Sequence, residues 1–142
     1  MNQKTHLLFL CVANSARSQI AEALAKKIFG SKAVVSSAGS KPYGQIQHGA
    51  IQVLNENNIS ILDQYSKSID QLPIDFLNKL DFVITLCAEE ICPYLPTQAK
   101  RLHWPMPDPV STSEHLKEQA FRQVFDLLNE KTADSWNSGK VQ

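Results

Sequence analysis

A cysteine and an arginine separated by five residues are the part of this sequence whose residue types and spacing most clearly predict chemistry. Cys11 ends an apolar run and Arg17 begins a stretch of helical periodicity, with small and polar residues between them. Such a loop can turn its backbone N–H groups inward at the helix N-terminus, where the helix dipole also favours an anion. The guanidinium of Arg17 can bind two oxygens of that anion at once. The pattern therefore predicts a site for a tetrahedral oxyanion above a cysteine nucleophile.

The same surroundings favour the thiolate form of Cys11. Positive charge, loop amides and a neighbouring hydroxyl each stabilise a negatively charged sulfur, and Ser18 is placed to donate that hydroxyl. The alternative is a buried structural cysteine beside a surface arginine, and the strand before Cys11 and the helix after it argue against that alternative. The residues expected to bind the oxyanion are Val12, Ala13, Asn14, Ser15, Ala16, Arg17 and Ser18.

Length, composition and charge limit the classes of protein to which the chain can belong. Its 142 residues suit one domain that is large enough to bury a hydrophobic core. The 14 Lys and Arg residues balance the 14 Asp and Glu residues, which argues against nucleic acid or an anionic membrane as the main partner. No apolar run is long enough to span a membrane, and the first residues lack the features of a signal peptide. We therefore expect a cytoplasmic protein.

Apolar runs and helical patterns alternate along the chain. The predicted strands are residues 6–12, 32–37, 81–87 and, as a weak edge strand, 101–104. The predicted helices are 17–29, ending at Gly30, then 47–57, then 69–80 with a break at Pro73, and finally about 114–131, capped by Thr112 or Ser113. A short helix or loop is expected up to residue 95 and a loop over the prolines of 105–109. Residues 1–131 are thus predicted to form one catalytic domain, and residues 132–142 a flexible tail.

Two of these predicted segments have apolar positions that should face the core. The expected core positions are Ala50, Ile51 and Leu54 in the second helix, and Leu116, Ala120, Phe121, Val124, Phe125 and Leu128 in the last one. Because strands and helices alternate, right-handed crossovers should return the strands in one direction. The predicted fold is α/β, with a central four-stranded parallel sheet in three α/β/α layers. Ligands are expected at the carboxyl ends of its strands.

The chain's other two cysteines lie after the third strand. Cys11 and Cys87 each end an apolar strand, and if those strands are neighbours, about 4.8 Å apart, the two sulfurs can meet after a modest shift. Cys92 follows five residues after Cys87. In a continuous helix their α-carbons would be about 8–9 Å apart, beyond the roughly 4.4–6.8 Å of a disulfide. A Cys87–Cys92 disulfide would therefore require the segment to unwind. The residues alone leave open that both are ordinary core cysteines.

Four ordered blocks within residues 5–131 resemble the thioredoxin-coupled arsenate reductases that have the low-molecular-weight phosphatase fold. The blocks are Cys11-x5-Arg17-Ser18-Gln-x-Ala-Glu, Ser36-Ser-Ala-Gly39, Val83-Ile-Thr-Leu-Cys87 followed by Cys92-Pro-x-Leu-Pro96, and His103-Trp-x-x-x-Asp108-Pro109. The resemblance implies that Cys11 attacks arsenate, which the arginine loop binds as it would phosphate or sulfate. It also implies that Cys87 and then Cys92 take over the oxidation, leaving a Cys87–Cys92 disulfide for thioredoxin to reduce.

Asp108 is the remaining catalytic candidate. From the local sequence, an aspartate between two prolines could equally be only a turn residue. The resemblance implies that it lies over the oxyanion loop and assists by proton transfer.

The chain also departs from that family. Ala13 stands where the family often has glycine, and Ala16 stands where a further cysteine occurs. The Cys87–Cys92 spacing is shorter than in the best-known members, which leaves the reach of Cys92 and the identity of its reductant open.

One departure concerns a cation. Members that bind potassium beneath the loop use an asparagine and a serine, matched by Asn14 and Ser37, and two later residues, where this chain has Tyr65 and Lys67. The Lys67 ammonium could replace the cation, so we expect no potassium dependence, no bound metal and no cofactor. The alternative is that Lys67 is a solvated loop residue.

Two rival functions use the same residues. In a low-molecular-weight protein-tyrosine phosphatase, Cys11 would form a phosphocysteine and Asp108 would protonate the leaving phenol. Such phosphatases usually have aromatic residues after the Asp-Pro pair, whereas Val110 and three small polar residues follow here, so only a weak side activity on aryl phosphates is expected. A metalloid sensor with three cysteine ligands is the other rival, but no DNA-reading element accompanies it and the cysteine spacing is poor for structural zinc.

Overall fold

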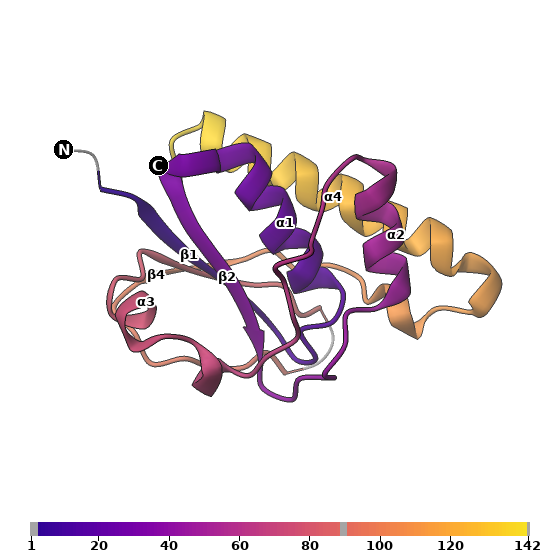
Figure 1. Cartoon of the computed structure of the whole chain (residues 1–142), viewed down its shortest axis with the longest axis horizontal. Helices are drawn as coiled ribbons and strands as arrows, with labels where there is room; N and C mark the ends of the chain where they lie inside the picture. Colours follow the sequence, from indigo (N-terminus) through magenta and orange to yellow (C-terminus); the bar gives the residue numbers. More distant parts are fainter. Residues whose placement is uncertain (1–2, 89–90, 142) are drawn as a thin grey trace.

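The computed structural model, which describes residues 3–88 and 91–141, has a parallel sheet between two layers of helices (Figure 1). Its strands are β1 (Thr5–Cys11), β2 (Ala33–Gly39), β3 (Phe82–Thr85) and β4 (Lys100–His103), in the order β2-β1-β3-β4. All three pairings are parallel, so the carboxyl ends of the strands lie along one edge of the sheet. The predicted four-stranded parallel sheet, with a short strand at its edge, is confirmed.

Helices cover both faces of this sheet. They are α1 (Arg17–Phe29), α2 (His48–Glu56), α3 (Ile74–Asn78) and α4 (Lys117–Asn137), with 3-10 turns at Gly30–Lys32, Ile69–Gln71, Pro109–Ser111 and Glu114–Leu116. One core lies between the sheet and the layer of α1, α2 and α4, and a second lies on the side of α3. Figure 1 shows α1 and α4 side by side, with α3 separate from them. The predicted three-layer α/β/α arrangement is confirmed.

The central strand β1 contributes to both cores, which explains why its sequence is continuously apolar rather than alternating. Leu7 and Phe9 point to the α1 side, and Leu8 and Leu10 to the α3 side; all four are fully buried. Cys11 follows on the α1 side at the carboxyl edge. The burial of β1 on both faces therefore fixes the position of Cys11.

The last helix differs from the sequence prediction at both ends. A 3-10 turn precedes α4, neither Thr112 nor Ser113 provides a side-chain cap to it, and Leu116 is exposed rather than part of the apolar stripe. The helix then continues past residue 131 to Asn137. The predicted helix end at about residue 131 is therefore wrong, because α4 includes residues 132–137.

Packing explains the longer helix. Trp136 stacks against Phe29 of α1 with ring centroids 4.7 Å apart, and Val141 is fully buried in the larger core. Full burial of one such apolar side chain contributes about 1.5–3 kcal/mol, which offsets the cost of ordering the backbone of about one or two residues. The polarity of residues 132–142 alone could not predict these contacts, because the partners lie far away in the sequence.

Other predicted boundaries agree with the structure to within a few residues. The break at Pro73 is confirmed, since a 3-10 turn precedes it and α3 follows it. In α2, Ala50 and Leu54 are buried as predicted, while Ile51 is only partly buried and Val53 takes the third core position. Among residues 91–99 the structure has no helix, and residues 89–90 of that predicted segment lie outside the described residues. No helix in the described part of the chain is both long and apolar enough to cross a bilayer.

Candidate active site

The loop between β1 and α1 forms the centre of the candidate site. Asn14 has a left-handed backbone (φ 49°), which turns the chain back over Cys11, and the amide N–H of Asn14 lies 3.3 Å from the Cys11 sulfur. Asparagine tolerates this conformation better than most residues. At the end of β2, a β-carbon on Gly39 would collide with the carbonyl oxygen of Val12. The loop therefore depends on a close backbone approach that glycine allows.

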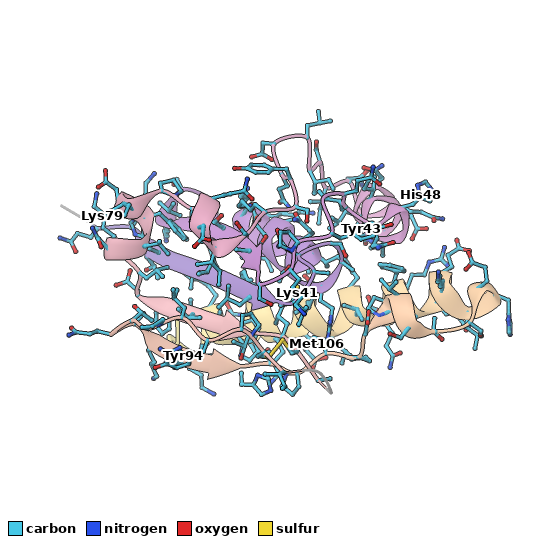
Figure 2. The ribbon with its side chains drawn as sticks, turned by 90° about the horizontal axis from the view of Figure 1, so that it is seen from below. Lys41, Tyr43, His48, Lys79, Tyr94 and Met106 are labelled. Atoms are coloured by element: carbon cyan, nitrogen blue, oxygen red, sulfur yellow. A yellow bond between two sulfur atoms is a disulfide. The ribbon has the colours of Figure 1, made fainter. Side chains whose placement is uncertain are left out.

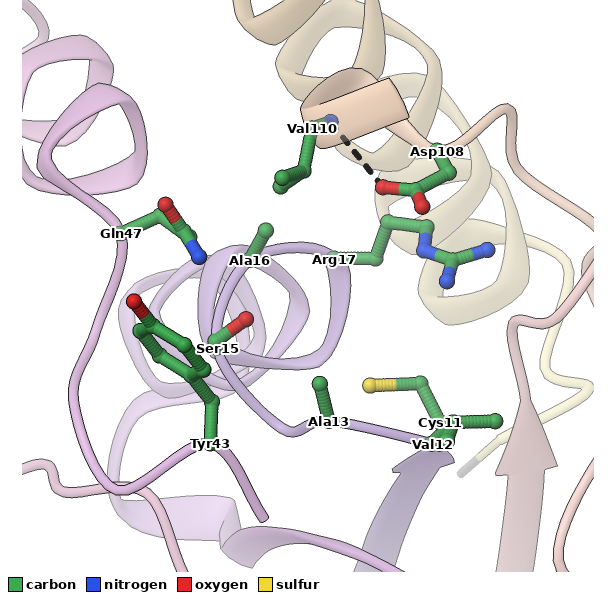
Figure 3. Close-up of a pocket in the computed structure, with 10 residues that line it drawn as sticks. All are labelled: Cys11, Val12, Ala13, Ser15, Ala16, Arg17, Tyr43, Gln47, Asp108 and Val110. Atoms are coloured by element: carbon green, nitrogen blue, oxygen red, sulfur yellow. Dashed lines mark hydrogen bonds between the residues drawn. The ribbon is translucent and has the colours of Figure 1, made fainter. Parts of the chain in front are cut away.

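A cavity of about 370 Å³ opens above this loop (Figure 3). Its lining includes Cys11 and five of the seven residues predicted to bind an oxyanion, namely Val12, Ala13, Ser15, Ala16 and Arg17. The other two, Asn14 and Ser18, do not line the cavity and contact the Cys11 sulfur instead. Tyr43, Gln47, Asp108 and Val110 complete the lining.

Polar groups surround the Cys11 sulfur. The Cys11 sulfur is nearly buried, and the Ser18 hydroxyl lies 2.9 Å from it, as the sequence predicted. Ala16, at the N-cap of α1, has no side-chain oxygen to occupy the first N–H groups of the helix. These groups and the positive end of the helix dipole are therefore directed at the cavity, where they favour an anion.

Arg17 and Asp108 line the same side of the cavity (Figure 3). The Arg17 guanidinium donates a hydrogen bond to the carbonyl oxygen of Met106, at 3.2 Å. The carboxylate of Asp108 accepts from the amide N–H of Val110 at 3.0 Å and from the hydroxyl of Ser111 at 2.8 Å. Asp108 thus both caps its own turn and lines the cavity, so the two sequence interpretations of this residue are compatible.

A buried polar network holds the loop from beneath. The Asn14 side-chain amide donates to the hydroxyls of Ser18 (2.7 Å) and Ser37 (2.9 Å). Its oxygen accepts from the backbone N–H of Lys67 (2.9 Å) and from the Gln19 amide (3.1 Å). A fully bonded buried network of this kind fixes one conformation, because each broken bond leaves an unpaired polar group. The Asn14 side chain is therefore held by four partners, two on α1, one on β2 and one in the loop between α2 and α3.

A buried ion pair lies below this network. The Ser37 hydroxyl donates to Glu22 at 2.6 Å, and the Lys67 and Lys26 ammonium groups lie 3.9 and 2.6 Å from the Glu22 carboxylate. Lys67 is 5% exposed and its ammonium lies 4.6 Å from the centre of the Tyr65 ring. Burial lowers the pKa of Lys67, and the negative charge of Glu22 partly opposes that change. The alternative interpretation of Lys67 as a solvated loop residue is wrong.

The sequence analysis assigned no role to two glutamines of the site. Gln19 is fully buried and donates to Asn14 and to the carbonyl oxygen of Tyr65, while Gln64 donates to the backbone and side-chain oxygens of Gln19. Tyr43 and Gln47 of the cavity wall were also missed. A glutamine in a helix is usually a surface residue, and no sequence spacing links Gln19 to a residue 45 positions away.

The three cysteines come together at the carboxyl edge of the sheet. Strands β1 and β3 are neighbours, and the amide N–H of Leu86 donates to the carbonyl oxygen of Leu10 at 3.0 Å, next to Cys11 and Cys87. Cys87 is joined to Cys92 by a disulfide, with an α-carbon separation of 5.5 Å, while Cys11 is a free thiol. Figure 2 draws this disulfide as a yellow bond. The described residues between the two cysteines, Ala88 and Ile91, are not helical, as a disulfide between the cysteines requires.

The segment that leads to Asp108 is tied to the same strand end. The amide N–H groups of Trp104 and Met106 donate to the carbonyl oxygens of Thr85 and Leu86, at 2.8 and 3.0 Å. Met106 is therefore bonded both to the residue before Cys87 and to Arg17. The described residues contain no cluster of three or more His, Cys, Asp or Glu side chains arranged for a metal ion.

Comparisons with known proteins agree with this geometry. The family model described as low molecular weight phosphotyrosine protein phosphatase matches residues 6–138. An arsenate reductase of Oceanobacillus iheyensis is 42% identical over 132 residues, which cover 90% of this chain and 92% of the relative. A solved structure described as an arsenate reductase in the phosphate binding state has a TM-score of 0.79 at 29% identity, covering 99% of this chain and 100% of that one. A thioredoxin-dependent arsenate reductase of Corynebacterium glutamicum has a TM-score of 0.73 at 29% identity, covering 95% of this chain and 61% of that one.

Proposed function

The chain belongs to the low molecular weight phosphotyrosine protein phosphatase family, and we propose that within it the chain is an arsenate reductase with a three-cysteine relay that thioredoxin regenerates. The observation that carries the proposal is the state of the sulfurs. Cys11 is a free thiol beneath the oxyanion loop, and Cys87 and Cys92 are joined at the end of the neighbouring strand. This is the arrangement expected after arsenate has been reduced and before thioredoxin reduces the disulfide.

In the first step, the loop amides, the N-terminus of α1 and Arg17 bind arsenate, as they would bind phosphate or sulfate. The Cys11 thiolate, stabilised by Ser18 and the loop, attacks arsenic, and one arsenate oxygen leaves as water. Asp108 supplies the proton to that leaving oxygen, since its carboxyl group lines the same cavity. The product is a covalent adduct in which arsenic is still pentavalent.

In the second step, the thiolate of Cys87 attacks the Cys11 sulfur. A Cys11–Cys87 disulfide forms, the sulfur–arsenic bond breaks, and its electron pair stays on arsenic, which leaves as trivalent arsenite. The adjacency of β1 and β3 supports this step, because Cys11 comes one residue and Cys87 two residues after the last pair of the two strands, Leu10 and Thr85. Two thiols are thereby oxidised and one arsenic centre is reduced by two electrons.

In the third step, the thiolate of Cys92 attacks Cys87, and Cys11 leaves as a thiolate ready for another cycle. The Cys87–Cys92 disulfide then accepts two electrons and two protons from the dithiol of thioredoxin. Cys92 is only partly buried and its neighbour Ile91 is 92% exposed, which supports access by a protein reductant. We place this cycle in the cytoplasm, a compartment in which free thiols are maintained.

The experiment that tests the proposal compares the protein with its Cys11→Ser, Cys87→Ser and Cys92→Ser variants. Arsenate-dependent NADPH oxidation, measured with thioredoxin and thioredoxin reductase, should be abolished in all three variants. Aryl phosphate hydrolysis should be abolished only by Cys11→Ser, so the other two variants serve as folding controls. Full arsenate turnover by Cys92→Ser would contradict the relay and would require a small thiol such as glutathione to resolve Cys87.

A second, weaker activity on aryl phosphates is supported by one feature of the cavity. Tyr43 lies on its wall opposite Arg17 and offers an aromatic surface to a phenyl ring (Figure 3). Val110, however, stands where the phosphatases usually have an aromatic residue, so the ring would be covered on one side only. We propose that this hydrolysis uses Cys11 as nucleophile and Asp108 as general acid and is slower than arsenate reduction.

A further inference from the structure

The segment that follows Cys92 is held by few contacts. Within the described part of the chain, one hydrogen bond joins residues 91–96 to another element, and Arg101 of β4 donates it to the carbonyl oxygen of Leu95. The Leu95 side chain adds a partly buried contact with the smaller core. When the disulfide is reduced, the position of Cys92 relative to Cys87 therefore depends largely on the contacts of Arg101 with this segment.

Arg101 makes a second contact with the same segment. Its guanidinium lies over the ring of Tyr94, 4.4 Å from the ring centre, although Tyr94 is 73% exposed and packs against little else (Figure 2). A guanidinium can stack on a ring with its planar face while donating a hydrogen bond from its edge, and an ammonium cannot do both. Arg101 thus contacts two consecutive residues that begin two positions after Cys92.

We propose that Arg101 is a positioning residue for the redox reaction, which keeps Cys92 within reach of Cys87 and so favours the disulfide over the dithiol. The physical basis is the effective concentration of one thiol at the other. A loose segment lets Cys92 explore many positions after reduction, whereas a segment held at Tyr94 and Leu95 confines it near Cys87. The more the dithiol is confined, the less entropy is lost when the disulfide forms.

The test uses the purified full chain in mixtures of reduced and oxidised dithiothreitol. Reduced dithiothreitol gives two electrons and two protons to the Cys87–Cys92 disulfide and becomes a cyclic disulfide itself. The fraction of each cysteine pairing is then measured by alkylation and mass spectrometry. Arg101→Ala should lower the equilibrium constant for disulfide formation about three- to tenfold, since it removes one exposed cation–π contact and one charged hydrogen bond.

Further variants distinguish the contacts of Arg101 with Tyr94 and Leu95 from effects of net charge or of overall stability. Arg101→Lys should give a smaller loss than Arg101→Ala, because it keeps the charge and a donor but not the planar group. Tyr94→Ala should lower the constant as well, and the double variant should lose less than the product of the two single losses. Arg122→Ala, which removes an exposed arginine from α4, where it pairs with Glu56 and Glu118, is the matched control and should change nothing.

Two results would overturn the proposal. One is an equilibrium constant for Arg101→Ala within about twofold of the original, with the thermal unfolding of the reduced protein unchanged. The other is an equal loss in Arg101→Ala and Arg122→Ala, which would indicate an effect of net charge. If Arg101→Ala fails to fold, Arg101→Lys and Tyr94→Ala carry the same test. Because the measurement needs neither arsenate nor thioredoxin, its failure is distinguishable from a failure of the proposed function.

Discussion

The loop that holds Cys11 and the segment that holds Cys92 are built in opposite ways. Beneath the loop, the side chain of Asn14 alone makes four hydrogen bonds to buried partners, and the Glu22–Lys67 ion pair lies below them. In the described residues after Cys92, the side chain of Arg101 provides the one hydrogen bond to another element, and Ile91 and Tyr94 face solvent. The loop of Cys11 is thus fixed by a network, whereas the described residues after Cys92 have a single hydrogen bond to another element.

The difference follows from what each sulfur must do. An oxyanion is stabilised by donors that are already in place, because donors that must first be oriented cost free energy at the moment of reaction. In the proposed relay, a resolving cysteine must instead move between two sulfurs and then meet thioredoxin, which a network of buried bonds would prevent. The proposal therefore assigns a rigid loop to its first stage and a loosely held segment to its last.

The largest effect is expected from a substitution that disrupts the network beneath the Cys11 loop. Asn14→Ala removes four hydrogen bonds and leaves alanine in a left-handed conformation, so the amides above Cys11 lose their alignment. Arsenate turnover and aryl phosphate hydrolysis should fall together, by about a hundredfold in kcat/KM, since displacements near 1 Å have effects of that size. Urea unfolding should show a loss of about 3 kcal/mol or more, because buried partners are left unpaired.

Asn58→Ala is the matched control for that variant. Asn58 also has a left-handed backbone (φ 61°), but it is exposed just after α2, away from the cavity. Its replacement should cost about 1 kcal/mol of stability and leave both activities unchanged. Near-normal kcat/KM in Asn14→Ala would mean that the loop keeps its shape without the network.

A smaller effect is expected from the ion pair below the network. We predict no difference between potassium chloride and sodium chloride at fixed ionic strength, since the Lys67 ammonium already lies 3.9 Å from Glu22. Lys67→Met should cost about 1–3 kcal/mol, less than the loss of a whole buried pair, because Lys26 still pairs with Glu22. A specific activation of the original protein by potassium would contradict the prediction.

The pH dependence of the same variant has a definite sign. Burial lowers the pKa of Lys67 in the folded protein below its ordinary value of 10.5, which the unfolded chain retains. At a pH between the lowered pKa and 10.5, the unfolded chain therefore binds more protons than the folded one. The free energy of unfolding of the original protein, relative to Lys67→Met, should therefore rise as the pH is raised toward 10.5. Urea unfolding at pH 8, 9 and 10 measures it, and a falling difference would show that the positive charge is favoured by the fold.

How much of the fold and of the candidate site the sequence predicts depends on how far apart in the chain the interacting residues lie. The start of α1 at Arg17 and its end before Gly30 follow from residues that are neighbours in the chain, and the sequence predicted both boundaries correctly. The end of β1 at Cys11 lies one residue before the predicted end. The alternation of strands and helices predicted a parallel sheet but not the order of its strands, so the pairing of β1 with β3 comes from the structure alone. Local patterns were sufficient for the loop because one strand, one turn and one helix build it.

The supports of the loop could not be found in this way. Gln64 and Lys67 reach Asn14 and Gln19 only because the chain between α2 and α3 folds back under the loop. The end of α4 was misplaced because Val141 and Trp136 find partners elsewhere in the core. In each case a polar or short segment is ordered by contacts distant in sequence, which periodicity does not record.

The smallest effect is expected from a substitution in the exposed segment around Cys92. Ile91→Asp replaces an exposed apolar side chain beside the disulfide, so the KM for thioredoxin should rise about fivefold, the equivalent of roughly 1 kcal/mol of lost apolar contact. Stability should change by less than about 0.5 kcal/mol, and turnover with dithiothreitol in place of thioredoxin should be unaffected. Leu62→Asp, at a residue that is 97% exposed in the loop after α2, is the matched control and should leave the KM unchanged. An unchanged KM in Ile91→Asp would mean that thioredoxin reaches the disulfide from a side that does not include Ile91.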